Sequence, residues 1–358
     1  MEREKNAKKV LDRLDKRKKT YIFGAGAVGN GMAKALEQCN FISTDQIVFL
    51  VNDGKKRENE EVLELSECKD NLEDCNVIYA IQSDEKSIYE KLVKRKNVND
   101  IIFVNIDTLT GFFALSYEEL LKENNISFTD KFIDCNGVKI INPLLMNKSL
   151  VNTFYAGLGD IILPECMGDY SRAEEGAYIN GKVNIEKGDV IIDCGANIGL
   201  FTAVAAARGG AVYAFEPMRE LADAVGLLKE VYDNVIVENV ALTDMIGKEC
   251  FYLDYDGFSG SSFEKKLGKA EEIETITLDE YVIKNGLERV DFIKADIEGS
   301  ERRMLKGAVE VMKRWAPKLS ICTYHLHDDK EVLEQIVREA NPRYKIVHKW
   351  KKMYAWIE

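Results

Sequence analysis

The chain has 358 residues, 46% of them hydrophobic, and a formal net charge of −12. This length and composition indicate a globular protein with room for two or more cores, and no apolar run approaches the roughly 20 residues that a membrane-spanning helix needs. The acidic balance argues against a general nucleic-acid binder, because phosphate contacts require concentrated Lys and Arg.

The first 19 residues are basic and contain no long apolar run, so we expect no secretory signal and a cytoplasmic protein. The eight Cys form no C-x-x-C pair, which predicts reduced thiols rather than a zinc ribbon or a disulfide scaffold. Val10, Leu11 and Leu14 fit one helical stripe. A basic amphipathic helix can bind membranes or nucleic acid, but more often it packs beside its own domain. We therefore expect neither nucleic acid as a partner nor stable membrane insertion.

Residues 20–110 alternate between strand and helix patterns. The apolar segments TYIF, QIVFLV, VIYAI and IIFVN are separated by charged stretches of helical composition. This rhythm predicts a parallel sheet with helices on its faces. We assign residues 1–115 to a Rossmann-like nucleotide-binding domain.

A glycine turn follows the first of these strands. The segment GAGAVG matches G-x-G-x-x-G with Gly24, Gly26 and Gly29, and Asp53 follows the second strand, later than is usual. No second mononucleotide half and no catalytic pair for hydride transfer are evident. We therefore favour a nucleotide or nucleotide-sugar ligand, or a purely structural domain, over redox chemistry with NAD.

Short turn signals replace the strand–helix rhythm in the next part of the chain, so we assign residues 116–159 to a connecting region. The rhythm returns in VIID, AVYAF, VIVEN, VDFIKAD and KLSICTY. These strands place a second α/β domain at residues 160–358.

The segment GDVIIDCGANIGLFTAVAAA contains a strand, a glycine turn and a helix. Asp193 ends the strand, and Glu216 ends the next strand about twenty residues later, a spacing at which an acid can accept the ribose hydroxyls of an adenosine. Two carboxylates would repel a diphosphate but suit a cationic ligand. The pattern therefore predicts S-adenosylmethionine as the cofactor.

Several short motifs occur in the order that is typical of one known enzyme family. They are VIIDCGANIGLFT, AFEP, NVALTD, ITLDEYV, VDFIKADIEGSE followed by LKGA, and ICTYH. Over residues 160–325 the chain resembles the FkbM-type S-adenosylmethionine-dependent methyltransferases. The resemblance implies a class I fold with a seven-stranded sheet whose last strand is antiparallel, closed by RYKIVHKW and KMYAWIE. It also implies methylation of a hydroxyl oxygen on a sugar, glycan or related metabolite. The cofactor residues expected are Asp193, Gly195, Ala196, Asn197, Gly199, Glu216, Ala241 and Leu242.

Methyl transfer to a hydroxyl requires alignment of three atoms and removal of one proton. Asp296 ends the fourth strand and Glu298 follows it, at the sheet edge where ligands gather. His325 follows the next strand and is the natural base near neutral pH, whereas His327 is expected to be exposed. We predict Asp296, Glu298 and His325 as catalytic residues. The same three residues could also ligate a divalent cation, but their spacing is no recognised metal signature, so we rank a metal site lower and assign no metal ligands.

The predicted activity is O-methylation of a small-molecule or carbohydrate acceptor. Ser261 and Ser262, in the Gly- and Ser-rich segment FYLDYDGFSGSSF, belong to a predicted loop that either covers the site or is simply solvated. Two alternatives remain: a nicotinamide-dependent oxidoreductase that uses the N-terminal turn, and a non-catalytic cofactor-binding protein. The oligomeric state stays open.

Overall fold

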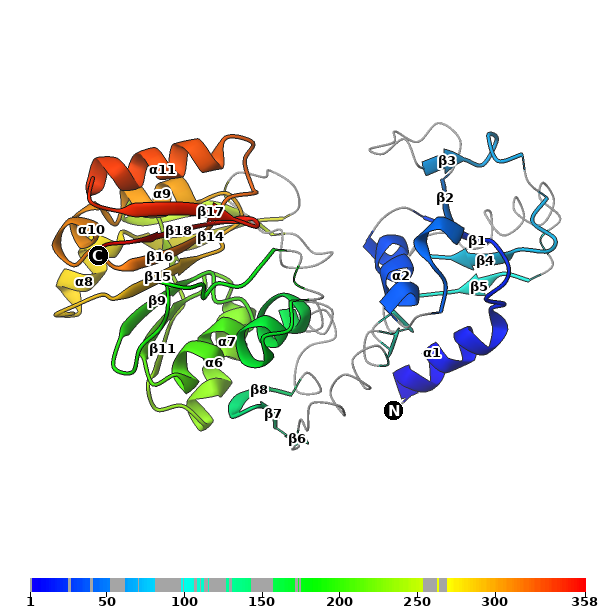
Figure 1. Ribbon diagram of the computed structural model, residues 1–358, viewed down its shortest axis with the longest axis horizontal. Helices are drawn as coiled ribbons and strands as arrows, with labels where there is room; N and C mark the ends of the chain where they lie inside the picture. The colour runs from blue at the N-terminus through cyan, green and yellow to red at the C-terminus, as the bar shows by residue number, and fades with distance from the viewer. Residues whose placement is uncertain are drawn as a thin grey trace. The chain divides into compact units, whose positions relative to one another are not determined.

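The computed structural model in Figure 1 divides the chain into two compact units, residues 1–125 and 126–358, which are described separately. The predicted boundaries at residues 115 and 160 stay predictions. The structure describes residues 2–24, 27–38, 41–51, 62–69, 71–80, 98, 100–105, 108–109, 111–112, 115, 127–128, 131–142, 157–170, 173, 175–253, 263 and 269–358. Within these ranges no helix has both the length and the apolar character needed to cross a membrane.

The first unit contains a parallel sheet of five strands in the order β3-β2-β1-β4-β5. Helix α1 packs on this unit, because Ala7, Val10 and Leu14 are buried in one cluster with α2, as the apolar stripe predicted. The elements are α1 (Glu2–Arg13), β1 (Thr20–Phe23), α2 (Ala27–Gln38), η1 (Thr44–Gln46), β2 (Ile47–Val51), β3 (Val62–Glu64), β4 (Asn76–Tyr79) and β5 (Ile102–Phe103).

The second unit is built on a seven-stranded sheet in the order β11-β10-β9-β15-β16-β18-β17. All neighbouring strands from β11 to β16 are parallel, and β18 runs antiparallel to both of its neighbours. This arrangement confirms the predicted class I fold. Its strands are β9 (Val190–Cys194), β10 (Ala211–Phe215), β11 (Val235–Glu238), β15 (Phe292–Ala295), β16 (Lys318–Cys322), β17 (Lys345–Lys349) and β18 (Lys352–Trp356).

Helices cover both faces of this sheet, which explains why its central strands are apolar throughout. Ile192 belongs to a core shared with α8–α11, whereas Ile191 belongs to a core on the opposite face shared with α6. The helical elements are η3 (Leu158–Met167), α6 (Leu200–Ala207), α7 (Arg219–Gly226), η4 (Leu227–Glu230), α8 (Leu278–Lys284), α9 (Glu301–Lys306), α10 (Val309–Arg314) and α11 (Asp329–Ala340).

The described part of the second unit also contains two smaller sheets, and the sequence analysis predicted neither. One has the order β12-β14-β13, and the other is the antiparallel meander β6-β7-β8. Residues 251–253, the start of the predicted loop, are instead the end of β13, whereas Ser261 and Ser262 lie outside the described residues. The strands are β6 (Ser127–Phe128), β7 (Phe132–Cys135), β8 (Val138–Ile141), β12 (Ala241–Leu242), β13 (Gly247–Leu253) and β14 (Lys269–Ile276).

Candidate active site

A cavity of about 420 Å³ opens at the carboxyl ends of β9, β10 and β15. The order of the sheet reverses between β9 and β15, and crevices at such switch points are where ligands bind in open α/β sheets. Eight predicted site residues line the cavity, and Asp193, Gly199 and His325 do not. The eight are Gly195, Ala196, Asn197, Glu216, Ala241, Leu242, Asp296 and Glu298.

The glycine turn between β9 and α6 brings two strand ends into close contact. Gly195 has φ +73°, and a Cβ there would lie 2.1 Å from the backbone oxygen of Asp296. Gly199 has φ +83° just before α6, and a Cβ there would lie 2.9 Å from Leu228. At Gly195 only glycine tolerates both the positive φ and the contact with backbone, whereas at Gly199 it is the positive φ that favours glycine. Gly195 therefore sets the separation between the turn and Asp296, whereas Gly199 serves helix packing.

Glu216 connects the glycine turn to the end of β10. Its carboxylate accepts hydrogen bonds from the backbone N–H of Asn197 at 2.9 Å and of Met218 at 3.0 Å. Burial raises the pKa of Glu216 to about 7, although these two hydrogen bonds act in the opposite direction. The buried Oδ1 of Asn197 has no hydrogen-bond partner among the described residues. The wall of the cavity thus offers two acceptor groups to a ligand.

Asp193 differs from the prediction. Its side chain is fully buried and does not line the cavity; Lys294 Nζ lies 3.0 Å from its Oδ1, and Thr202 donates a hydrogen bond to its Oδ2 at 2.6 Å. Lys294 also donates to the backbone oxygen of Gly195 at 2.7 Å. Asp193 therefore holds the lysine that fixes the glycine turn and does not meet the ligand directly.

Two polar side chains that flank Ala241 and Leu242 in the sequence point away from the cavity to other partners. Asn239 donates to the backbone oxygens of Glu216 and Pro217, and Asp244 is paired with Arg303 at 2.7 Å. Both residues stabilise the loops beside the cavity rather than line it.

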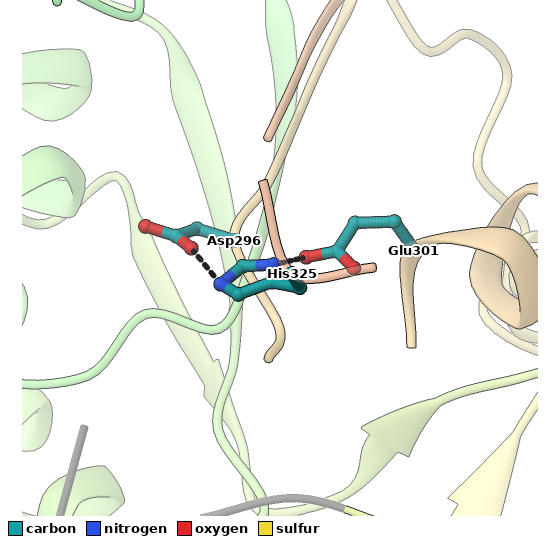
Figure 2. A group of neighbouring side chains, drawn as sticks. All are labelled: Asp296, Glu301 and His325. Carbon is teal, nitrogen blue, oxygen red and sulfur yellow. Dashed lines mark ion pairs between the residues drawn. The ribbon is translucent and has the colours of Figure 1, made fainter. Parts of the chain in front are cut away.

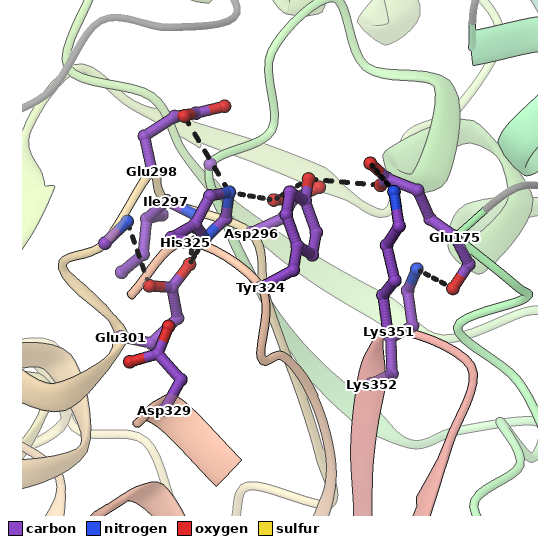
Figure 3. Close-up of polar contacts among 12 residues, drawn as sticks. Glu175, Asp296, Ile297, Glu298, Glu301, Tyr324, His325, Asp329, Lys351 and Lys352 are labelled. Atoms are coloured by element: carbon purple, nitrogen blue, oxygen red, sulfur yellow. Dashed lines mark hydrogen bonds and ion pairs between the residues drawn. The ribbon is translucent and has the colours of Figure 1, made fainter. Parts of the chain in front are cut away.

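Two tyrosines, Tyr178 and Tyr324, hold Asp296 at the other side of the cavity. Figure 3 shows Tyr324 between Asp296 and Glu175. Tyr178 donates to Asp296 Oδ2 at 2.5 Å, and the hydroxyl of Tyr324 lies within hydrogen-bond distance of both Asp296 and Glu175. Burial would raise the pKa of Asp296, but the charges of Lys294 and His325 outweigh burial and lower it. Sequence analysis missed Tyr178 and Glu175, which precede β9 in a segment with no catalytic motif.

His325 lies behind Asp296, between carboxylates on both sides of its ring (Figure 2). Glu301 Oε1 is 2.9 Å from Nδ1, Asp296 Oδ1 is 3.6 Å from Nε2, and Glu298 Oε2 is 3.8 Å from Nε2. Burial lowers the pKa of His325, but Glu301 and the other two carboxylates outweigh it and raise the pKa to about 9. A pKa of about 9 favours the protonated ring near neutral pH, whereas the predicted role as general base requires the neutral ring.

Glu301, which the sequence analysis did not select, organises this end of the site. It is fully buried, and its two oxygens accept hydrogen bonds from the backbone N–H of Ile297 at 2.8 Å and of Gly299 at 3.0 Å. These bonds hold the turn in which Glu298 adopts φ +54°. His327, by contrast, is 95% exposed, as expected.

The N-terminal glycine turn is described only in part. Gly24 has φ +117°, and a Cβ on Gly29 would lie 1.7 Å from the backbone oxygen of Gly24, so Gly29 permits close packing of the helix on the turn. Gly26 and Asp53 lie outside the described residues. Nucleotide binding by this unit stays a prediction.

Comparison with known proteins finds a family match for part of the second unit. The family model described as "Methyltransferase FkbM domain" matches residues 193–345. The 31-O-demethyl-FK506 methyltransferase FkbM of Streptomyces tacrolimicus is 28% identical over 195 residues, which cover 45% of this chain and 74% of that protein.

Two solved structures are also similar. The methyltransferase FkbM from Methylobacillus flagellatus KT has a TM-score of 0.43 at 17% identity, over 98% of this chain and 93% of the other. The fibrillarin of Aeropyrum pernix, solved with S-adenosyl-L-methionine, has a TM-score of 0.31 at 13% identity, over 50% of this chain and 70% of the other. Residues 193–345 thus match the FkbM methyltransferase domain, and this match together with the class I sheet supports an S-adenosylmethionine-dependent methyltransferase.

Proposed function

We propose that the protein transfers the methyl group of S-adenosylmethionine to a hydroxyl oxygen of a sugar, glycan or related metabolite. The observation that carries the proposal is one continuous cavity, lined by Glu216 and Asn197 on one side and by Asp296 and Glu298 on the other. The oxygen chemistry is supported by the curated relative, whose name records a demethylated oxygen in its substrate.

The residues on the first side fit the donor. Glu216 presents a carboxylate to which two ribose hydroxyls can donate, and the unpartnered Oδ1 of Asn197 can accept from an ammonium group. Ala241 and Leu242 are buried and line the cavity, which suits the flat apolar face of an adenine. When bound, the donor supplies an activated methyl group.

The residues on the second side face the acceptor. Asp296 is held by the hydroxyl of Tyr178, so its carboxylate is fixed before the acceptor arrives. The acceptor hydroxyl gives its proton to a carboxylate of this side, Asp296 or Glu298. The oxygen–methyl bond forms as the methyl–sulfur bond breaks, and the sulfonium becomes a neutral thioether. His325 acts through Asp296 rather than on the acceptor, because it does not line the cavity.

Methyl transfer from a donor with an isotopically labelled methyl group tests this proposal. A panel of sugars, glycosides and polyketide-like alcohols would be incubated with the protein, and NMR of the product would identify the methylated atom. We expect an O-methyl product that Asp296→Ala abolishes and His327→Ala leaves intact. Labelling of nitrogen or carbon only would contradict the oxygen assignment.

The first unit is proposed to bind a nucleotide or nucleotide-sugar that presents the acceptor. Calorimetry with a UDP-sugar and with NAD tests this proposal separately. Binding of the UDP-sugar alone supports acceptor presentation. Binding of NAD alone would favour the oxidoreductase alternative for this unit.

A further inference from the structure

The imidazole of His325 is buried without a satisfactory hydrogen bond. Its side chain is only 3% exposed, and neither ring nitrogen has a hydrogen-bond partner among the described residues. Glu301 Oε1 is 2.9 Å from Nδ1 and makes an ion-pair contact there, and the nearest carboxylate oxygens to Nε2 are 3.6 and 3.8 Å away. Because buried polar atoms are rarely left unpaired, this ring points to a ligand.

The surroundings of the ring favour a positively charged ligand. Three carboxylates approach it, from Asp296, Glu298 and Glu301. The buried lysines nearby are engaged elsewhere: Lys294 is paired with Asp193, and Lys352 donates to the backbone oxygen of Glu175. Carboxylates around a buried ring are costly unless positive charge balances them. In the metal-free protein a proton on His325 supplies that charge, and a bound cation would replace the proton, because imidazole binds metals in its neutral form.

The donor atoms are also close enough to share one ion. Asp296, Glu301 and His325 each offer one ligand atom, and these three atoms lie within 4.8 Å of one another. Two carboxylate oxygens and one imidazole nitrogen form a donor set that suits Mn²⁺, Mg²⁺ and related divalent cations. The sequence gives no spacing motif for this set, because Glu301 lies on α9 and the other two residues follow two different strands.

We infer that Asp296, Glu301 and His325 bind a divalent metal cation beside the methyl-transfer cavity. This inference rests on the proposed function and deepens it. Asp296 is the member of the set that lines the cavity, so an acceptor hydroxyl reaches the ion from that side. The ion would polarise the hydroxyl, whose proton passes to Glu298 as the oxygen–methyl bond forms and the methyl–sulfur bond breaks.

Binding of Mn²⁺ alone tests the site directly. The full-length protein would be treated with a chelator, freed of it, and titrated with Mn²⁺ while the electron paramagnetic resonance signal of free Mn²⁺ is recorded. We expect about one bound Mn²⁺ per chain, competed by Mg²⁺, and binding at least about tenfold weaker in Asp296→Asn and in His325→Ala. The matched control is His327→Ala, which removes an exposed histidine two residues away and should bind like the wild type.

Donor binding separates this inference from the proposed function. Calorimetry with S-adenosylhomocysteine would be carried out on the same chelated protein. Absence of Mn²⁺ binding in the millimolar range, or equal binding in Asp296→Asn, His325→Ala and wild type, would overturn the metal site even where S-adenosylhomocysteine still binds. Methyl transfer that persists in chelator would also overturn it and leave the methyltransferase proposal standing. Mn²⁺ binding without binding of S-adenosylhomocysteine would support the metal site and contradict the proposed methyl transfer.

Discussion

Glu216 should make donor binding depend on pH. Burial raises its pKa to about 7 in the donor-free protein, and the ribose hydroxyls of the donor require the ionised carboxylate as acceptor. A protonated Glu216 must therefore lose its proton before the donor binds. With a pKa near 7, the dissociation constant should rise about tenfold between about pH 8 and about pH 6, which corresponds to about 1.4 kcal/mol.

Isothermal titration calorimetry with S-adenosylhomocysteine across this pH range measures the effect. In Glu216→Gln the change of the dissociation constant with pH that is due to Glu216 should disappear. Binding at about pH 8 should weaken by about 1.5–3 kcal/mol, the range for a hydrogen bond to a charged group. Glu165→Gln is the matched control, because Glu165 is also buried with a pKa raised to about 7 but lies outside the cavity. A wild-type affinity that does not change with pH, or the same slope in Glu216→Gln, would refute the reasoning.

The same shift predicts the sign of a stability change in the donor-free protein. Because the folded-state pKa of Glu216 is raised above its unfolded value of about 4.5, the folded state binds more protons between these two values. The free energy of unfolding should therefore fall as pH rises from about 4.5 to about 7, by up to about 3 kcal/mol from this group. Urea denaturation over this pH range measures the effect. The free energy of unfolding should fall more steeply with pH in the wild type than in Glu216→Gln, and equal slopes in the two proteins would contradict the prediction.

Three further substitutions test how the site is held together. Gly195→Ala should weaken S-adenosylhomocysteine binding about tenfold or more and lower the free energy of unfolding by about 1–3 kcal/mol, because its Cβ would meet the backbone of Asp296; unchanged affinity in calorimetry would contradict this. Lys294→Met should lower the free energy of unfolding in urea by about 3–5 kcal/mol, because it leaves the buried carboxylate of Asp193 without its ion-pair partner. Adding Asp193→Leu to the same chain should recover most of this loss. A loss below about 1 kcal/mol in Lys294→Met would contradict a stabilising role of the pair. Met304→Ala should cost about 2–5 kcal/mol in the same assay with donor affinity retained, because Met304 is fully buried in the core and does not line the cavity.

The sequence by itself determined the local units of the second domain. An apolar run ending at Asp193, a turn with Gly195 and Gly199, and an alanine-rich helix specify β9, the turn and α6 through short-range preferences alone. The positions of Glu216 and Asp296 at strand ends follow from the same rhythm, because parallel strands bring their carboxyl ends to one edge. The class I strand order came from the resemblance of the motifs, and the structure confirms it.

Only the tertiary structure decided which side chains meet. Parallel pairing of β9 with β15 sets Lys294 opposite Asp193, a hundred residues away in sequence, and so removes Asp193 from the cavity. The turn after β15 and the segment after β16 bring Glu301 and Asp296 to His325. The physical reason is range: secondary structure follows from neighbours in the chain, whereas burial and charge depend on partners that only the register of the sheet selects.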